Sequence, residues 1–246
     1  MSVIRSSNPG LRVHYRVKET IVTIGADCDE YIEVAKKAIQ NERRLLEGFI
    51  IKDPFFKVTL EPYEVPASAP GIVRRMAEAA RVMGIGPMGA VAGTIAAYAV
   101  EAMLEEGALY AFVDNGGDIA LVTDRPLVLG IYAGEASIKD LALEVQPTDE
   151  MLGICTSSGT VGPSISFGSA DAALVVSRNV SLADAAATAL GNAVVDEGTL
   201  EDAFVAVRNI NGIQGALVVK ADRFAVWGGM PRVVRAKMKP DHITRG

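Results

Sequence analysis

The stretch GAVAGTIAAYAVEAMLEEGALYAFVDNGGDIAL (residues 89–121) carries the clearest structural pattern in the chain. Its Ala-rich first half predicts a helix over residues 88–106, which Gly107 closes. The run LYAFV (109–113) predicts a strand, and the two adjacent glycines that follow predict a tight turn into a second strand over 119–122. One short segment therefore predicts a helix followed by two antiparallel strands.

The predicted helix begins with residues that leave almost no side chain on its first turns. Either another backbone or a flat ligand can approach such a surface closely, and a surface for packing another helix is the alternative. Both interpretations remain open from the sequence. The small residues are Gly89, Ala90, Ala92, Gly93 and Ala96.

The turn between the two strands also allows two interpretations. The dipeptide Asn115-Gly116 is a strong hairpin signal, so a plain type I′ hairpin explains the pattern. However, Asp114, Asn115 and Asp118 place three polar groups around the glycines Gly116 and Gly117. Exposed backbone N–H groups together with polar side chains are also suited to binding a ligand.

The rest of the chain predicts further strands and helices in blocks rather than in strict alternation. Such an order favours an α+β fold with a mostly antiparallel sheet covered by helices, in a single domain over 1–246. Short tails are expected at 1–10 and 229–246. Strands are expected within 11–24 (two), over 55–60, 127–132, 171–176, 215–219 and 223–227, and helices from Asp29 to about Glu47, over 71–83 and over 181–194.

Composition excludes several classes of function. The net charge is −6 and no cluster of basic residues is present, which argues against nucleic-acid binding. Only two cysteines occur and no basic-apolar leader opens the chain, so a cytoplasmic location is expected. The segment 85–104 has the length of a membrane span, but its apolarity comes from Ala and Gly, and we expect a buried helix and no membrane contact.

A second distinctive stretch is CTSSGTVG (155–162), which is rich in Ser, Thr and Gly. Its amides and hydroxyls could surround a phosphate or a ring edge, and a self-contained surface loop is the alternative. The thiol of Cys155 is a candidate reactive group if backbone N–H groups lower its pKa, or else a small buried hydrophobe. The candidate ligand-binding residues here are Thr156, Ser157, Ser158, Gly159 and Thr160.

A third stretch, SLADAAATALG (181–191), places Asp184 and Thr188 four residues apart, on one face of the predicted helix. A carboxylate and a hydroxyl are hard oxygen ligands that suit Mg²⁺. The alternative is a helix N-terminus in which Ser181 is the cap and Asp184 completes a weakened capping box.

These three stretches, in this order, resemble the ApbE flavin-transferase family over about residues 10–228. More narrowly, the segments GPMGAVAG, DNGGD and CTSSGTVG resemble the uncharacterised ApbE-like family. The resemblance implies an ApbE-like α+β fold and a pocket for FAD or a related nucleotide, hence for an anionic small molecule. The pocket would lie between the double-glycine turn, the Ser-Gly loop and the start of the Ala-rich helix. Asp184 and Thr188 match the residues that hold Mg²⁺ in that family.

The chain also departs from the transferases in two places. They carry a Lys before a Gly in the Ala-rich helix and a His in a segment after the Ser-Gly loop, whereas this chain has AVAGT and VGPSISFGSAD there. Its histidines are His14 and His242. We therefore expect the pocket to be kept and flavin transfer to be lost or changed.

Relatives of the ApbE-like family are associated with sulfide assimilation into homocysteine. An alternative function is therefore a non-enzymatic or thiol-based accessory protein, with a protein partner in sulfur metabolism. The surfaces rich in Gly and Ala could also serve a homo-oligomer.

Overall fold

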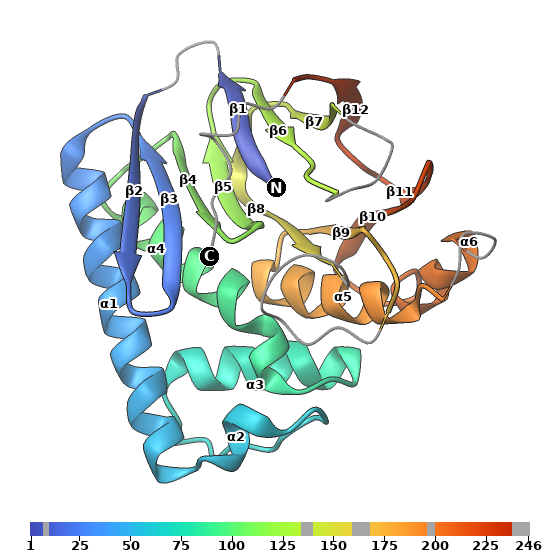
Figure 1. The fold of residues 1–246 in the computed structure, drawn as a ribbon. Coiled ribbons are helices and arrows are strands. Elements are labelled where there is room, and N and C mark those ends of the chain that lie inside the picture. Colours follow the sequence, from blue (N-terminus) through green and yellow to red (C-terminus); the bar gives the residue numbers. More distant parts are fainter. Residues whose placement is uncertain (7–9, 134–139, 159–167, 196–199, 238–246) are drawn as a thin grey trace.

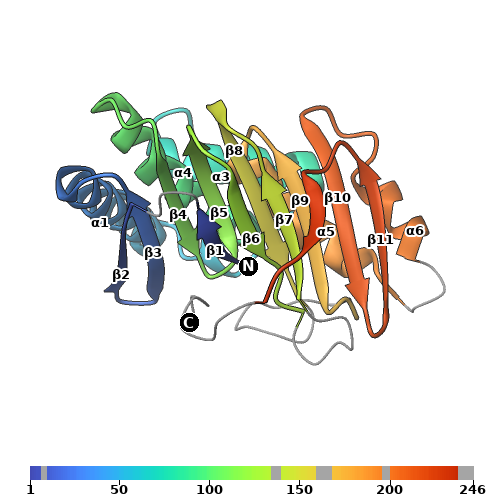
Figure 2. The same cartoon turned by 90° about the horizontal axis from the view of Figure 1, so that it is seen from above.

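The computed structural model describes residues 1–246 except 7–9, 134–139, 159–167, 196–199 and 238–246 (Figure 1). Its elements form three layers, in which a layer of helices, a large sheet and a small sheet lie one on another (Figure 2). The predicted α+β class with a mostly antiparallel sheet is confirmed, because every strand pair in both sheets is antiparallel.

The large sheet has eight strands in the order β11-β10-β9-β8-β5-β4-β3-β2. Its strands are β2 (Leu11–Val17), β3 (Thr20–Ala26), β4 (Ala111–Asn115), β5 (Asp118–Thr123), β8 (Thr148–Ser157), β9 (Ala172–Ser177), β10 (Ile213–Lys220) and β11 (Arg223–Gly228). The central strands β4, β5 and β9 are almost fully buried, because both of their faces are covered. The long strand β8 was not predicted, since its first half is polar and partly exposed.

The small sheet has four strands in the order β1-β6-β7-β12. These strands are β1 (Ser2–Ser6), β6 (Leu127–Gly130), β7 (Leu141–Val145) and β12 (Arg232–Arg235). The prediction of terminal tails was wrong for residues 2–6 and 232–235, which pair with β6 and β7. Neither segment alternates strongly enough to be recognised alone, and partner strands distant in the sequence supply its hydrogen bonds.

Helices cover the opposite face of the large sheet. They are α1 (Asp29–Lys52), α2 (Phe55–Val58), α3 (Gly71–Met83), α4 (Val91–Glu105), α5 (Val180–Ala193) and α6 (Leu200–Ala203), with 3₁₀ turns at Pro87–Ala90 and Phe204–Ala206. The strand predicted over 55–60 was wrong: Pro54 starts the short helix α2, and Phe56 is buried against the core. Helix α1 begins at Asp29 after Cys28 at the N-cap and continues past Glu47 to Lys52.

The strand residues alternate between two apolar cores. Val113, Ala120 and Val175 belong to the core between the large sheet and the helices. Their neighbours Phe112, Ile119 and Leu174 belong to the core between the two sheets. This period of two decides which side chains of each strand can reach the helices.

The segment Pro87–Glu105 is long and apolar enough to cross a membrane by length and composition alone. In this structure it is a central helix, since α4 contacts α1, α5, β4 and β5. More than half of it is buried inside the protein. The residues of α4 that pack inward include Ile95, Ala96, Ala99, Val100 and Met103.

Candidate functional site

The hairpin between β4 and β5 is the first component of the site. Asn115 pairs with Asp118, and Gly116 and Gly117 between them have φ of 69° and 108°. Two consecutive positive φ values are those of a type I′ hairpin, so the turn prediction is confirmed. The Gly117 N–H donates to Asp114 Oδ1 at 2.9 Å, which holds the turn closed.

The start of α4 meets this hairpin directly. Asn115 Nδ2 donates to the Ala92 carbonyl at 3.0 Å, and only 8% of Asn115 is exposed. On the other side, the Gly93 N–H donates to Asp184 Oδ2 at 2.8 Å. The first turn of α4 is therefore held between the hairpin and α5, which lie far apart in the sequence.

Asp184 consequently has a role that the sequence did not suggest. The N-cap of α5 is Asn179, whose Oδ1 accepts from the Leu182 N–H at 3.1 Å, so the predicted Ser181–Asp184 capping box is wrong. Ser181 Oγ instead lies 2.8 Å from Thr94 Oγ1 in α4. Asp184 Oδ2 caps the N-terminus of α4 from a neighbouring helix by accepting the Gly93 N–H.

Gly93 shows why small residues occupy this turn. A Cβ there would lie 2.7 Å from Asp184 Cβ and 3.0 Å from the Val180 carbonyl, so α5 packs directly against the backbone of α4. At this position the packing interpretation of the small residues is correct. Ala90 is likewise fully buried in the core.

Gly89 differs from these two residues because it is only partly buried. Its carbonyl oxygen lies 3.5 Å from Thr188 Oγ1, one helical turn after Asp184. Asp184 and Thr188 therefore both face the start of α4, and the Gly89 carbonyl beside Thr188 is a third oxygen there, although the sequence suggested only the first two as metal ligands.

Two carboxyl groups, of the partly buried Asp118 and the buried Asp184, influence each other at this place. Burial raises the pKa of Asp118 to about 7, and the negative charge of Asp114 adds to the increase, against a hydrogen bond from the Thr156 N–H. Burial also raises the pKa of Asp184 well above its ordinary value, and the charge of Asp118 acts in the same direction. Both groups resist ionisation because little water reaches them.

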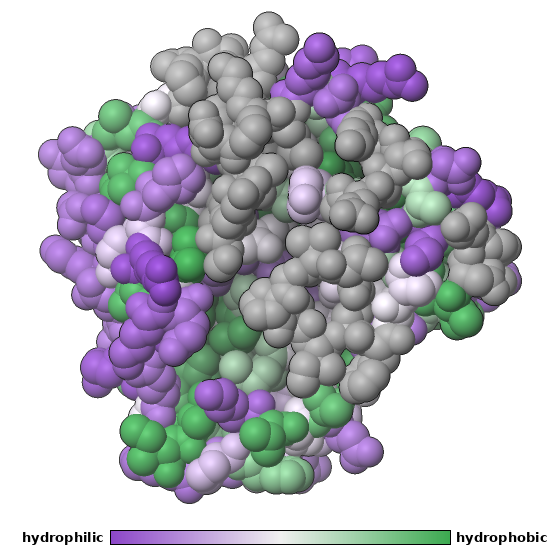
Figure 3. Space-filling view, in the orientation of Figure 1, coloured by the Kyte–Doolittle hydropathy of each residue, from purple (hydrophilic) through white to green (hydrophobic). Residues whose placement is uncertain are grey.

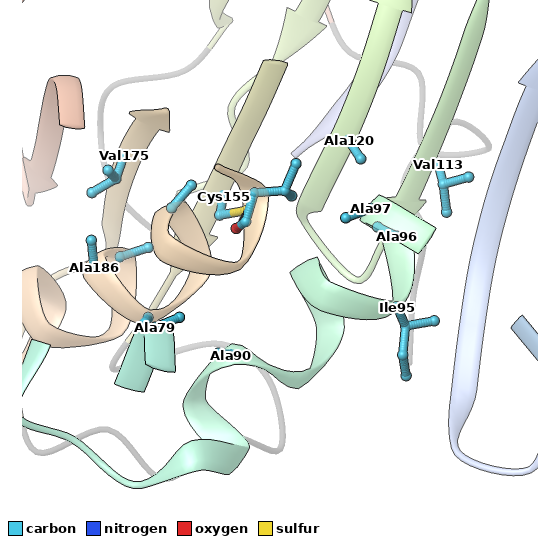
Figure 4. Packing of buried hydrophobic residues seen from close by; sticks show 14 of the residues in the cluster. Ala79, Ala90, Ile95, Ala96, Ala97, Val113, Ala120, Cys155, Val175 and Ala186 are labelled. Atoms are coloured by element: carbon cyan, nitrogen blue, oxygen red, sulfur yellow. Dashed lines mark hydrogen bonds between the residues drawn. The ribbon is translucent and has the colours of Figure 1, made fainter. Parts of the chain in front are cut away.

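Cys155 lies between these carboxyl groups and is fully buried. Figure 4 shows it among the buried residues of the layer between the sheet and α5. Burial raises the pKa of its thiol, and the nearby Asp118 and Asp184 raise it further. Of the two interpretations of Cys155, the small buried side chain is the one that agrees with the structure, and its Sγ lies 3.7 Å from the Val180 carbonyl.

The other residues of the Ser-Gly stretch fall into two groups. Thr156 Oγ1 is buried and has no hydrogen-bond partner within the described chain, and Thr156 Cβ lies near Gly117. Ser157, on the next position of β8, lies against Gly191 of α5, and Ser158 is partly exposed. Gly159 and Thr160 lie outside the described residues.

The oxygen atoms at the start of α4 offer a partial set of ligands for Mg²⁺. No group of three or more Asp, Glu, His or Cys side chains that could hold a metal occurs among the residues the structure describes. A mixed set consisting of the Asp184 carboxylate, the Thr188 hydroxyl and the Gly89 carbonyl nevertheless has the hard oxygen chemistry of a magnesium site that also keeps waters or phosphate oxygens.

Histidine is not part of this site in the described chain. His14 lies on β2, where its Nδ1 is 2.9 Å from Thr23 Oγ1, and His242 lies outside the described residues. Two hollows lie away from this site. One, of about 420 Å³, is lined by residues of β7 and β12, and the other, of about 410 Å³, lies beside α1.

A match over residues 3–204 to the family described as "AbpE bacteria" identifies the class of protein. The chain belongs to this family, as its three sequence stretches predicted. It is 56% identical over 236 residues to a UPF0280 protein of Methanosarcina acetivorans, covering 96% of this chain and 93% of that protein. A UPF0280 protein of Archaeoglobus fulgidus is 47% identical over 240 residues, covering 96% and 99%.

Solved structures with the same fold include ApbE proteins. The flavinyl transferase ApbE of Pseudomonas stutzeri, in its apo form, matches with a TM-score of 0.59 at 12% identity, over 92% of this chain and 96% of that one. The ApbE protein of Thermotoga maritima matches with a TM-score of 0.57 at 13% identity, over 96% and 99%. At these identities the likeness establishes the fold alone.

Proposed function

We propose that this protein binds a flavin dinucleotide such as FAD, or a related nucleotide, together with Mg²⁺ at the start of α4. One observation carries the proposal: Asp184 contacts the Gly93 N–H and Thr188 lies by the Gly89 carbonyl, so both side chains of α5 face the start of α4. The Asn115–Asp118 hairpin contacts the same turn through Asn115 and Ala92. The solved structures that share this fold include proteins described as flavin transferases, which supports a flavin as the nucleotide.

The chemistry of these groups agrees with an anionic ligand held through a metal. Mg²⁺ would supply positive charge beside a pyrophosphate, and Asp184, Thr188 and Gly89 would hold it. The positive end of the α4 dipole points to the same place. The buried Thr156 hydroxyl, which has no partner in the described chain, is a further group that a bound ligand could satisfy.

We infer that binding occurs without the transfer reaction of the flavin transferases. A hydroxyl acceptor must lose its proton during such a transfer, and a positioned base normally takes it. In the described part of the chain neither a His nor a Lys stands at the site, and the candidate thiol of Cys155 is buried with a raised pKa. The protein therefore binds the flavin as a ligand.

Titration calorimetry with FAD, with and without Mg²⁺, tests the proposal. Binding is expected only with Mg²⁺, and both Asp184→Asn and Thr188→Val should weaken it at least tenfold, while Thr148→Val at the far end of β8 should leave it unchanged. The asparagine can still accept from the Gly93 N–H, so the fold is retained. Failure of FAD, FMN, ATP and NAD⁺ to bind in the presence of Mg²⁺ would contradict the proposal.

A non-enzymatic accessory role in sulfide assimilation, in the cytoplasm, is the second function that the resemblance suggests. The burial of Cys155 disfavours its thiol-based form. The accessory form predicts a stable complex with a protein of sulfur metabolism or a homo-oligomer. Affinity purification of the original protein and of the Asp184→Asn variant from cells grown on sulfide distinguishes this role from nucleotide binding. An accessory protein should form the same complex in both cases, because the complex would not depend on the nucleotide site.

A further inference from the structure

A groove of about 410 Å³ lies between the last turns of α1 and the proline-rich connector that follows α2. Leu45, Gly48 and Phe49 of α1 form one side, and Pro66 and Pro70 of the connector form part of the other. The groove lies on the outer side of α1 and shares no residue with the site at the start of α4.

Gly48 makes this groove deeper than a regular helix surface would be. It lies inside α1 (Asp29–Lys52), where glycine is the poorest helix former apart from proline. A Cβ at Gly48 would have no atom of the described residues within 4 Å, and the φ of Gly48 is not positive. Neither packing nor backbone conformation within the chain therefore requires a glycine, so the space that it leaves is available to something outside the chain.

The charges along the groove have one sign. Arg44 and Lys52 both line it, and no Asp or Glu does so within the described chain. Acidic residues close to these cations in the sequence have other partners: Glu47 pairs with Lys18 and Arg43, and Asp53 accepts a hydrogen bond from the Tyr63 hydroxyl. Glu42, whose carboxylate Arg44 influences electrostatically, accepts from Asn41 Nδ2. Lys52 has no partner among the described residues, and Arg44 donates only to Asn41 Oδ1.

The surface beyond Lys52 is apolar. Figure 3 shows hydrophobic side chains gathered at the lower end of the molecule, over α2. Four large apolar residues there are more than half exposed, which is more than the scattered hydrophobic residues of an ordinary surface. They are Ile51 (79%), Phe55 (59%), Val58 (65%) and Leu60 (56%).

We propose that the groove between α1 and the connector binds an extended, acidic peptide segment of a partner protein. Arg44 and Lys52 are eight residues apart, so their Cα atoms are separated by about 12 Å along the helix axis. An extended chain rises about 3.3 Å per residue, and two carboxylates three or four residues apart therefore match both cations. Apolar side chains between them enter the space at Gly48, and the apolar surface over α2 receives the flanking part of the partner.

Selection of random twelve-residue peptides on the immobilised full chain tests this proposal. The selected peptides are expected to carry Asp or Glu three or four residues apart around apolar residues. Their dissociation constants, measured by fluorescence anisotropy, should rise at least tenfold in Gly48→Leu, which fills the groove, and in Lys52→Glu, which reverses its charge. The Gly48→Leu variant should melt no lower than the original protein.

Two control variants lie on the same helix outside the groove. Lys37→Leu and Lys37→Glu add the same side chains at an exposed position, and binding should change less than twofold. Peptides without acidic residues, or peptides that bind Gly48→Leu and Lys52→Glu unchanged, would overturn the proposal. So would a dimer in sedimentation equilibrium, or binding to vesicles of phosphatidylglycerol, if Gly48→Leu abolished either one, because a second copy or a lipid surface would then occupy the groove.

Discussion

Gly93 in α4 and Gly48 in α1 are both glycines in helices, but their surroundings differ completely. A Cβ at Gly93 would collide with Asp184 and with the Val180 carbonyl, whereas a Cβ at Gly48 would meet nothing. The first glycine allows α5 to approach so closely that Asp184 caps α4. The second leaves an open groove between two cations. The same residue type is thus required by packing in one helix and left unexplained by packing in the other.

The largest expected effect is that of Gly93→Ala. The added methyl group must push α5 away from α4, and overpacking of this kind costs about 3 kcal/mol. Chemical denaturation should show this loss in the free energy of unfolding, and FAD binding should weaken with it. Unchanged stability would mean that α5 does not pack against Gly93.

Asn115→Ala is expected to have the next largest effect. It removes the hydrogen bond from Asn115 Nδ2 to the Ala92 carbonyl, and the loss of one such hydrogen bond costs about 1.5 kcal/mol. Because the hairpin would then no longer hold α4, FAD affinity should fall as well. Asn115→Asp is the matched variant, since it keeps the shape but cannot donate when ionised. If the alanine variant is as stable as the original protein, the hairpin does not hold the start of α4 in place.

Gly48→Ala should have the opposite sign. Alanine replaces glycine inside α1 without a clash, so the free energy of unfolding should rise by about 1 kcal/mol. Thermal melting monitored by circular dichroism measures this increase. A decrease would show that Gly48 is required by the fold, and the contrast with Gly93 would disappear.

Asp184→Asn should have the smallest effect on stability at low pH, and its effect should grow as the pH rises. The pKa of Asp184 is raised in the folded protein, so the original protein loses stability as the pH rises above the ordinary value of 3.8. The asparagine variant escapes this loss, although its amide oxygen accepts less strongly from Gly93. Its Tm should match the original at pH 3 and exceed it at pH 7. A constant difference across this range would contradict the raised pKa.

Local sequence patterns predicted much of the fold. Asn115-Gly116-Gly117 identified the hairpin, because few residues tolerate two positive φ values in a row. The Ala-rich pattern identified α4, and the pair Asp184 and Thr188 was correctly placed on one face of a helix that meets the Ala-rich helix. The sequence did not reveal β1, β7, β8 and β12, since their pairing partners lie far away in the chain and their own patterns are weak.

The sequence alone determined the family, the hairpin and the run of small residues at the start of the Ala-rich helix, because each depends on residue type and close spacing. The tertiary structure alone decided that Asp184 caps α4 and that Cys155 is a buried thiol with a raised pKa. It also decided that the space beside Gly48 is open. Each of these depends on which distant segments come into contact and on how much water they exclude, and no local pattern of residues contains that information.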